Sequence, residues 1–317
     1  MTLLKKGISV VIPVYNSQES LPELAARLET TLKSLDTEYE TIFVNDGSKD
    51  KSWEIIQELA TTYPFIIGIN LMRNYGQHNA LLAGVRSARY DILITMDDDL
   101  QHPPEEIPKL LSKLEEGYDV VYGSPQNEQH GLLRDMASVM TKMAMKAIIN
   151  VDIAPHVSAF RAFHTLLRYS FENYYGTKPS LDVLLTWGTN KFSYIDVKHD
   201  VRAKGRSNYT LLKLCTHAMN MITGFSTIPL RLATFLGFAF TFFGGGLIIY
   251  VISRYLMSGT PVPGFPFLAS IITIFSGVQL FTLGIFGEYL ARMHTRLLDC
   301  PPFAIKEVKT GTGVLTE

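Results

Sequence analysis

The chain has 317 residues, which is long enough for a complete α/β domain and a smaller second part. Its formal net charge of −1 provides no basic excess, which argues against nucleic-acid binding. The two cysteines, Cys215 and Cys300, form no CxxC pair, which argues against a zinc site or a disulfide scaffold and fits a reducing compartment.

From residue 8 to about residue 88, apolar runs typical of strands alternate with amphipathic runs typical of helices. The predicted strands cover residues 8–13, 39–45 and 65–71, and the predicted helices cover 18–35, 51–61 and a stretch from Gln77. The first apolar run is short and contains Pro13, so it is typical of a strand and not of a signal peptide. This alternation predicts a parallel, doubly wound sheet, which binds ligands at the carboxyl ends of its strands.

Polar residues follow each predicted strand at this carboxyl edge. The groups are Tyr15-Asn16 after Pro13, then Asp46-Gly47-Ser48, then Arg73-Asn74-Tyr75-Gly76. Neither GxGxxG nor GxxxxGK[ST] occurs, so neither a dinucleotide-binding turn nor a P-loop explains the domain. Each group taken singly also fits an ordinary turn or helix cap. Their convergence on one edge makes them candidates for a binding site.

A fourth apolar run, residues 92–96, ends in three consecutive carboxylates, Asp97, Asp98 and Asp99. Side chains alternate along an extended strand, so Asp97 and Asp99 are expected on one face and Asp98 on the other. Together with Gln101 they offer an oxygen-only donor set, which suits Mg²⁺ or Mn²⁺ better than zinc. Taken alone, the cluster also fits an acidic turn before the helix that Pro103-Pro104 opens.

Further along the chain, the sequence predicts a helix over residues 104–116, a strand over 118–123, a methionine-rich helical segment near 131–150 and a strand over 192–197. The next loop carries Arg202, Lys204 and Arg206 around a glycine, followed by Ser207. Guanidinium and ammonium groups bind phosphates, so the loop is a candidate phosphate clamp. A solvated surface loop is the alternative.

The C-terminal part predicts membrane association. Residues 209–230 mix apolar and polar side chains at helical spacing, which is typical of an interfacial helix. Two long apolar runs follow, about 232–252 and 265–286. The first carries no charge and would be about 31 Å long as a helix, which matches the bilayer core. A pair of buried core helices is the alternative.

Most basic residues near the predicted hairpin lie at the end where the chain enters and leaves it, and not at the turn between the two spans. Only Arg254 lies near the intervening turn, whereas the other cations precede or follow the two spans: Lys204, Arg206, Lys213, Arg231, Arg292, Arg296 and Lys306. The positive-inside rule then predicts that the N-terminal domain and the C-terminal tail face the cytoplasm. The expected organisation is a domain over 1–208, an interfacial helix over 209–230, two spans within 231–292 and a tail over 293–317.

The segments already quoted resemble glycosyltransferase family 2 as a set. They are Val11-Ile12-Pro13-Val14-Tyr15-Asn16, Asn45-Asp46-Gly47-Ser48, Arg73-Asn74-Tyr75-Gly76-Gln77-His78 and Asp97-Asp98-Asp99-Leu100-Gln101 with Pro103-Pro104. Residues 225–231 and 284–292 resemble the bacterial, membrane-anchored polyisoprenyl-phosphate glycosyltransferases related to dolichol-phosphate mannose synthase. Residues 74–78 and 100–108 look most like the undecaprenyl-phosphate 4-deoxy-4-formamido-L-arabinose transferases of lipid A modification.

The resemblance implies a GT-A fold and an inverting transfer of sugar from a nucleotide diphosphate sugar, with UDP as the expected nucleotide, to undecaprenyl phosphate at the bacterial inner membrane. It implies nucleotide-sugar contacts at Pro13, Tyr15, Asn16, Asp46, Arg73, Asn74 and Asp97. It further implies a metal, Mg²⁺ or Mn²⁺, on Asp99 and Gln101, and phosphate contacts at Arg202, Lys204, Arg206 and Ser207. Asp97, Asp99, Arg202 and Arg206 would form the catalytic set. Related membrane enzymes suggest a homo-oligomer, with a flippase acting downstream.

Three positions depart from the family pattern. Residues 154–158 replace a Gly-Asp-Phe-Arg type segment, Asn208 stands where a lysine is usual, and Ser17 replaces an acidic residue. They fall where the sugar and acceptor would be handled, so a non-catalytic membrane scaffold that binds nucleotide sugar or a flippase is one alternative. A processive polysaccharide synthase is another, although the chain lacks a Gln-x-x-Arg-Trp motif. We interpret the histidines, among them His102 and His156, as structural, because an anionic lipid phosphate needs no general base.

Overall fold

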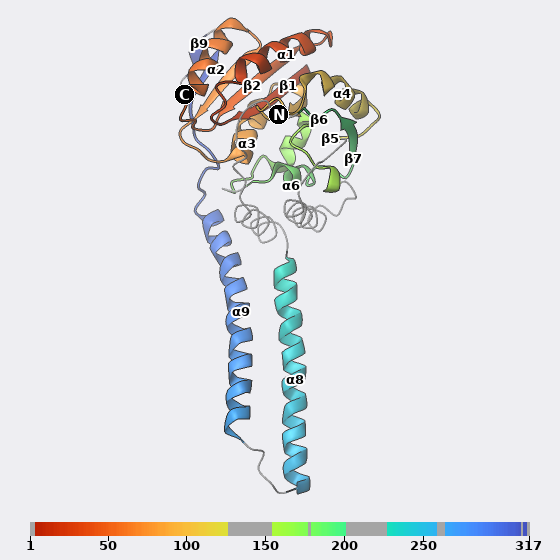
Figure 1. Cartoon of the computed structure of the whole chain (residues 1–317), viewed down its shortest axis with the longest axis vertical. Coiled ribbons are helices and arrows are strands. Elements are labelled where there is room, and N and C mark those ends of the chain that lie inside the picture. Colours follow the sequence, from red (N-terminus) through yellow and green to blue (C-terminus); the bar gives the residue numbers. More distant parts are fainter. Residues whose placement is uncertain are drawn as a thin grey trace. The chain divides into compact units, whose positions relative to one another are not determined.

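The computed structural model describes residues 4–125, 154–176, 179–200, 227–258, 264–311 and 313–315. The chain divides into two units. One, called here the sheet unit, consists of Met1–Cys215 and Asp299–Glu317, and the other, called the hairpin unit, is Thr216–Leu298. Figure 1 shows the helices and strands of both units, labelled where there is room.

The strands and helices of the sheet unit alternate along the first part of the chain, as the sequence predicts. In order, the elements are β1 (Lys5–Val14), α1 (Leu21–Lys33), β2 (Tyr39–Asn45), α2 (Ser52–Thr62), β3 (Ile66–Leu71), α3 (Gln77–Ser87), β4 (Tyr90–Thr95), η1 (Pro104–Glu106), α4 (Ile107–Glu115), β5 (Val120–Pro125), η2 (Ala154–His156), β6 (Arg161–His164), η3 (Thr165–Phe171), α6 (Leu181–Leu185), β7 (Phe192–Val197), β8 (Ile305–Thr310) and β9 (Gly313–Leu315).

The described strands form one mixed sheet in the order β7-β5-β6-β4-β1-β2-β3-β8-β9. The pairs β4–β1, β1–β2, β2–β3 and β5–β7 are parallel. Strand β1 is buried on both faces: Val10 and Ile12 belong to the core cluster that includes residues of α1 and α2, and Val11 lies against Gly84 of α3. Such double burial requires a continuous apolar run, which residues 10–14 provide. The prediction of a mainly parallel, doubly wound sheet is confirmed.

Three of the described strands, β6, β8 and β9, lie where no strand was predicted. Strand β6 inserts antiparallel between β4 and β5. Strand β8 pairs antiparallel with β3, and β9 pairs with β8. Within the expected tail over residues 293–317, residues 305–310 form a strand that extends the sheet at the β3 edge, where unpaired backbone N–H and C=O groups accept another strand.

The hairpin unit contains α8 (Ile228–Ser258) and α9 (Phe265–Leu297), which run side by side. They contain the predicted spans 232–252 and 265–286, and α9 continues past Phe286. Phe240 and Phe275 meet edge to face, with ring centroids 5.8 Å apart. Segments of 29 and 24 residues within them are long and apolar enough to cross a membrane. Large side chains such as Phe242 and Leu280 are exposed, which is costly in water and suits lipid, so the two helices indicate a membrane protein.

Two predicted helices lie outside the described residues: the methionine-rich segment near 131–150 and nearly all of the interfacial segment 209–230. Residues 228–230 of the latter belong to the first turn of α8.

Candidate active site at the carboxyl edge of the sheet

The loops after β1, β2, β3 and β4 enclose a pocket of about 260 Å³. Parallel strands β1–β4 end at this edge together, so residues distant in the sequence meet here. The lining residues are Pro13, Val14, Tyr15, Asp46, Asn74, Gly76, Gln77, Asp97, Asp98 and Asp99. Polar side chains from three loops therefore face one cavity, which is the usual form of a small-ligand site.

Asp46 joins the loop after β2 to the loop after β3. Its carboxylate accepts hydrogen bonds from the backbone N–H groups of Tyr75 and Gly76, at 2.7 and 2.8 Å. The amide nitrogen of Asn74 donates to the Asp46 carbonyl at 3.0 Å. Burial raises the pKa of Asp46, and the two backbone donors counteract that shift by stabilising the charged form.

Glycines permit this close contact between the two loops. Gly47 has a φ of 63°, and a Cβ there would lie 2.6 Å from the backbone nitrogen of Asn74. Gly76, with a φ of 95°, precedes the first turn of α3. Both residues adopt the left-handed region that favours glycine, which explains their place in the loop sequences.

We expect the change Asp46→Ala to lower the free energy of unfolding of the sheet unit by about 2 kcal/mol, because two charge-assisted hydrogen bonds disappear and two N–H groups lose their acceptor. The melting temperature of the detergent-solubilised chain measures this loss, and hydrogen exchange at Tyr75 and Gly76 should accelerate. Glu58→Ala, at an exposed position on α2, is the control. Equal melting temperatures for the two variants would contradict the assignment.

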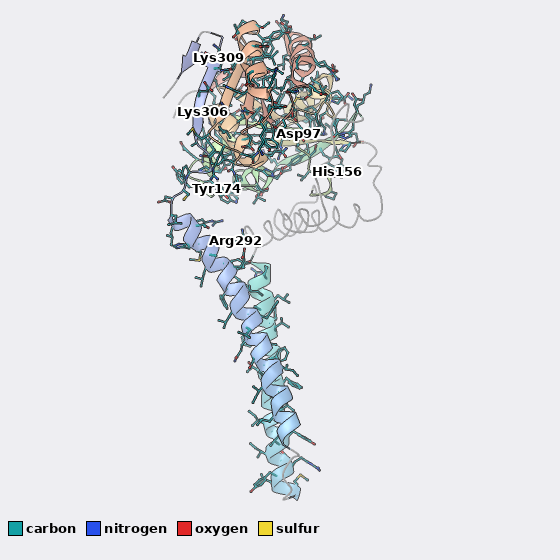
Figure 2. All side chains as sticks on the ribbon, turned by 60° about the vertical axis from the view of Figure 1, so that its left-hand side comes forward. Asp97, His156, Tyr174, Arg292, Lys306 and Lys309 are labelled. Carbon is teal, nitrogen blue, oxygen red and sulfur yellow. The ribbon has the colours of Figure 1, made fainter. Side chains whose placement is uncertain are left out.

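The three consecutive carboxylates lie just beyond β4. Asp97, labelled in Figure 2, accepts a hydrogen bond from the side-chain amide of Gln77 at 2.7 Å. Asp98 accepts one from the backbone N–H of Tyr15 at 3.3 Å, and Asp99 accepts one from the backbone N–H of Gln101 at 3.1 Å. Burial raises the pKa of Asp98 to about 6, and the adjacent charge of Asp99 adds to the shift.

The expectation that Asp98 points away from its two neighbours is wrong, because all three carboxylates line the pocket. The alternation of side chains holds only in an extended strand, and β4 ends at Thr95. The chain then turns sharply, and Leu100 adopts a φ of 61° although it is buried. A leucine in this region is strained, and such strain concentrates at functional sites.

A buried ion pair lies behind the carboxylates and was missed by the sequence reasoning. Arg161 of β6 forms a salt bridge with Asp182 of α6, and both side chains are buried. The guanidinium also donates to the hydroxyl of Thr95 at 3.0 Å, and the Tyr122 hydroxyl donates to Asp182 at 3.1 Å. Burial raises the pKa of Tyr122 well above its usual value. The available signal was a lone arginine between Phe160 and Ala162, since a charge within an apolar run needs a partner.

A second buried group adjoins the carboxylates. The ring of His102 stacks on Phe160 and meets His199 edge-on, with its Nε2 atom 3.5 Å from the hydroxyl of Ser158. Burial lowers the pKa of His102 to about 4, so the ring is neutral at physiological pH. His156 stacks on Tyr194 and approaches the hydroxyl of Ser124 at 3.2 Å. These contacts are those of packed side chains.

Some predicted site residues lie beside the pocket rather than in its lining. Asn16 has a φ of 54°, and its side chain accepts a hydrogen bond from the backbone N–H of Lys49. The guanidinium of Arg73 lies 4.7 Å from the ring centre of Tyr75. Gln101 contributes its backbone N–H to Asp99. Their roles toward a ligand stay predictions.

Other predicted residues cannot be placed, and one lining residue was absent from the prediction. Arg202, Lys204, Arg206 and Ser207 lie outside the described residues. Gln77 was expected only as the start of a helix, yet its side chain orients Asp97. Its position directly after Gly76, at a helix N-terminus on the carboxyl edge, was the signal that could have identified it.

Comparisons with known proteins agree with this geometry. The model of the family "Glycosyl transferase family 2" matches residues 9–174. An undecaprenyl-phosphate 4-deoxy-4-formamido-L-arabinose transferase from Shewanella sediminis is 35% identical over 308 residues, covering 96% of this chain and 93% of the relative. A protein of the same name from Pseudomonas savastanoi pv. phaseolicola is 35% identical over 317 residues, covering 98% and 94%.

The sheet unit also resembles a solved structure. Glucosyl-3-phosphoglycerate synthase from Mycobacterium tuberculosis, in complex with Mn²⁺, UDP and glucosyl-3-phosphoglycerate, is 17% identical, with a TM-score of 0.51. The match covers 69% of this chain and 78% of that protein. At this identity the likeness shows a common fold.

Proposed function

The chain belongs to glycosyltransferase family 2 and is a glycosyltransferase, and on that premise we propose that it transfers a sugar from a nucleotide diphosphate sugar to a polyisoprenyl phosphate. The observation that carries the proposal is the pocket in which Asp46 and three consecutive carboxylates meet, in a chain that also carries two apolar helices. The named relatives, similar along nearly the whole chain, support undecaprenyl phosphate as the acceptor. The UDP in the structural neighbour supports a UDP-linked donor.

The donor atoms of the pocket fit a hard divalent cation such as Mg²⁺ or Mn²⁺. Among the residues that the structure describes, no three His, Cys, Asp or Glu side chains are arranged to hold a metal ion by themselves. A magnesium-type site commonly uses only one or two carboxylates and completes its shell with substrate phosphates and water. We propose Asp99 as the carboxylate ligand with Gln101 beside it, and Asp97 as the carboxylate that faces the sugar nucleotide. When bound, such an ion supplies positive charge that neutralises the diphosphate of the leaving nucleotide.

The protein's own groups bind and orient the donor. Tyr15, Asn74 and Asp46 line the pocket, and we propose that they contact the nucleoside. Gln77 holds Asp97 in a fixed orientation for the sugar nucleotide. The nucleophile is the lipid phosphate, whose second pKa is near 6, so it is largely anionic at neutral pH. No side chain has to remove a proton, which agrees with the lowered pKa of His102, because a ring with a low pKa is a weak base. Direct attack on the anomeric carbon inverts its configuration.

The acceptor determines where the reaction takes place. A polyisoprenyl phosphate remains in the bilayer, so the enzyme must work at a membrane surface. We propose that α8 and α9 anchor it there and that the basic residues 202–206 hold the lipid phosphate. The excess of Lys and Arg on both flanks of the hairpin supports a cytoplasmic position of the sheet unit at the inner membrane.

The purified full-length protein, incubated with labelled UDP-sugars and undecaprenyl phosphate, tests the proposal. The panel includes UDP-4-deoxy-4-formamido-L-arabinose, the donor that the relatives' names suggest. We expect an organic-extractable sugar lipid that requires undecaprenyl phosphate, disappears with EDTA and returns when Mg²⁺ or Mn²⁺ is added in excess. Formation of the lipid in EDTA would contradict the metal site. No product across the panel would contradict the donor and acceptor classes.

A further inference from the structure

A row of polar side chains crosses three neighbouring strands of the sheet unit. Asn45 of β2 is in register with Asn70 of β3, and Asn70 is in register with Glu307 of β8. The Asn70 side-chain amide donates to a Glu307 carboxylate oxygen at 3.0 Å, and the Asn45 amide donates to the Asn70 side-chain oxygen at 2.8 Å. Asn45 and Asn70 are buried, so both depend on these contacts to satisfy their hydrogen bonds.

The carboxylate gives this row a single direction. An ionised Glu307 only accepts hydrogen bonds, so the NH₂ group of Asn70 must face it and the Asn70 oxygen must face Asn45. The NH₂ group of Asn45 then faces Asn70, which leaves the Asn45 oxygen for the backbone N–H of Ser48, at 3.3 Å. Exchanging the positions of the oxygen and the NH₂ group in either amide would place two donors or two acceptors face to face in a buried environment.

The row ends in the loops that form the pocket. Ser48 follows Asp46 by two positions, and its hydroxyl accepts the backbone N–H of Asn16 at 3.0 Å. Asn16, in the left-handed region, follows Tyr15, which lines the pocket. The hydrogen bonds therefore run without a break from Glu307 to the two loops that carry Tyr15 and Asp46.

The residue directly before β8, Ala304, supports the third loop of the pocket as well. The backbone N–H of Met72 donates to the carbonyl of Ala304 at 2.9 Å, just before residues 73–76 form the loop that holds the Asp46 carboxylate. All of these β8 contacts come from a segment that follows α9 in the chain.

We propose that Glu307 is a positioning residue of the nucleotide pocket, so that donor binding depends on the strand that follows the membrane hairpin. Glu307 does not line the pocket and acts through Asn70, Asn45 and Ser48. The inference rests on the nucleotide-binding role proposed above. It assigns the segment after the hairpin to the substrate site of the sheet unit.

The test compares Glu307→Ala, Glu307→Gln and a matched control in the full-length protein in detergent. Lys306→Ala is the control, because Lys306 is exposed on the same strand and is labelled in Figure 2. We expect Glu307→Ala to weaken UDP binding and raise the KM for the donor about tenfold, the effect of one lost charge-assisted hydrogen bond. The kcat value should change less than twofold. Glu307→Gln keeps an acceptor oxygen and should restore most of the affinity.

Hydrogen exchange in the absence of nucleotide separates this inference from the proposed function. Peptides that cover Asn16 and Ser48 should exchange faster in Glu307→Ala than in the wild type. In Lys306→Ala they should exchange at the wild-type rate. Equal exchange together with wild-type UDP affinity in Glu307→Ala would overturn the inference and leave the proposed function intact. If the wild type binds no nucleotide sugar, the proposed function fails. If Glu307→Ala does not fold, Glu307→Thr takes its place with the same expected and contradicting outcomes, because threonine favours a strand and its hydroxyl is too short to reach Asn70 as the carboxylate does.

Discussion

Replacement of Asp99 by alanine is expected to lower kcat/KM for glycosyl transfer by at least about 10²–10³, the range observed when a group that stabilises developing charge is removed from an active site. Asp99 lines the pocket with Asp97 and Asp98, and the backbone N–H of Gln101 holds its carboxylate. The loss should appear in initial rates at saturating Mg²⁺ or Mn²⁺. Asp99→Asn should be almost as inactive, since the amide carries no negative charge to balance that of the cation.

The structural cost of Asp99→Ala should be small, because one backbone hydrogen bond is worth about 1 kcal/mol. A melting temperature close to that of the wild type would therefore accompany the loss of activity. Glu54→Ala, at an exposed position on α2, controls for the removal of a carboxylate elsewhere. Wild-type turnover by Asp99→Ala would exclude this residue from the metal site and leave Asp97 and Asp98 as the candidates.

Replacement of Arg161 by alanine is expected to lower the free energy of unfolding by about 3–5 kcal/mol, because it leaves the buried carboxylate of Asp182 without its counter-charge. The hydroxyls of Thr95 and Tyr122 cannot compensate a full charge. Thermal unfolding of the detergent-solubilised protein measures the effect. Activity should fall as well, since Thr95 is the last residue of the strand that carries the three carboxylates.

A double variant distinguishes the contribution of the ion pair to stability from the contribution of side-chain packing. Arg161→Met combined with Asp182→Leu removes both charges and keeps apolar volume, so it should be more stable than either single change. Arg168→Ala removes a less buried arginine and serves as the matched control. Additive losses in the double variant would show that the two charges do not depend on each other.

The first half of the sheet was predictable because its signals are local. The apolar run of β1 has to be buried on both faces, and the polar groups after β1, β2, β3 and β4 have to meet at one edge, since parallel strands end together. The placement of Tyr15, Asp46, Asn74 and Asp97 in one pocket follows from these two rules. The side on which Asp98 lies did not follow, because the strand ends two residues before Asp97 and the chain turns at Leu100.

The strands that escaped prediction depend on distant partners. Strand β8 has the sequence Ile-Lys-Glu-Val-Lys-Thr, which is too polar to predict a buried strand. The preceding Pro301-Pro302 favoured the prediction of a tail. Its partner β3 lies more than two hundred positions earlier. The short strand β6 contains the buried Arg161, whose charge is tolerated there because it forms a salt bridge with Asp182. In both cases tertiary contact outweighs local pattern.

The position of β8 after the two apolar helices also orders events during synthesis. Chains fold from the N-terminus as they emerge, so β1 to β7 can assemble early. The edge of β3 stays unpaired until both helices and then Glu307 have left the ribosome, and a bare strand edge invites association with other chains. The nascent chain therefore gains β8 only after its two apolar helices exist, which ties the completion of the proposed donor pocket to the stage at which the chain can reach the proposed lipid acceptor.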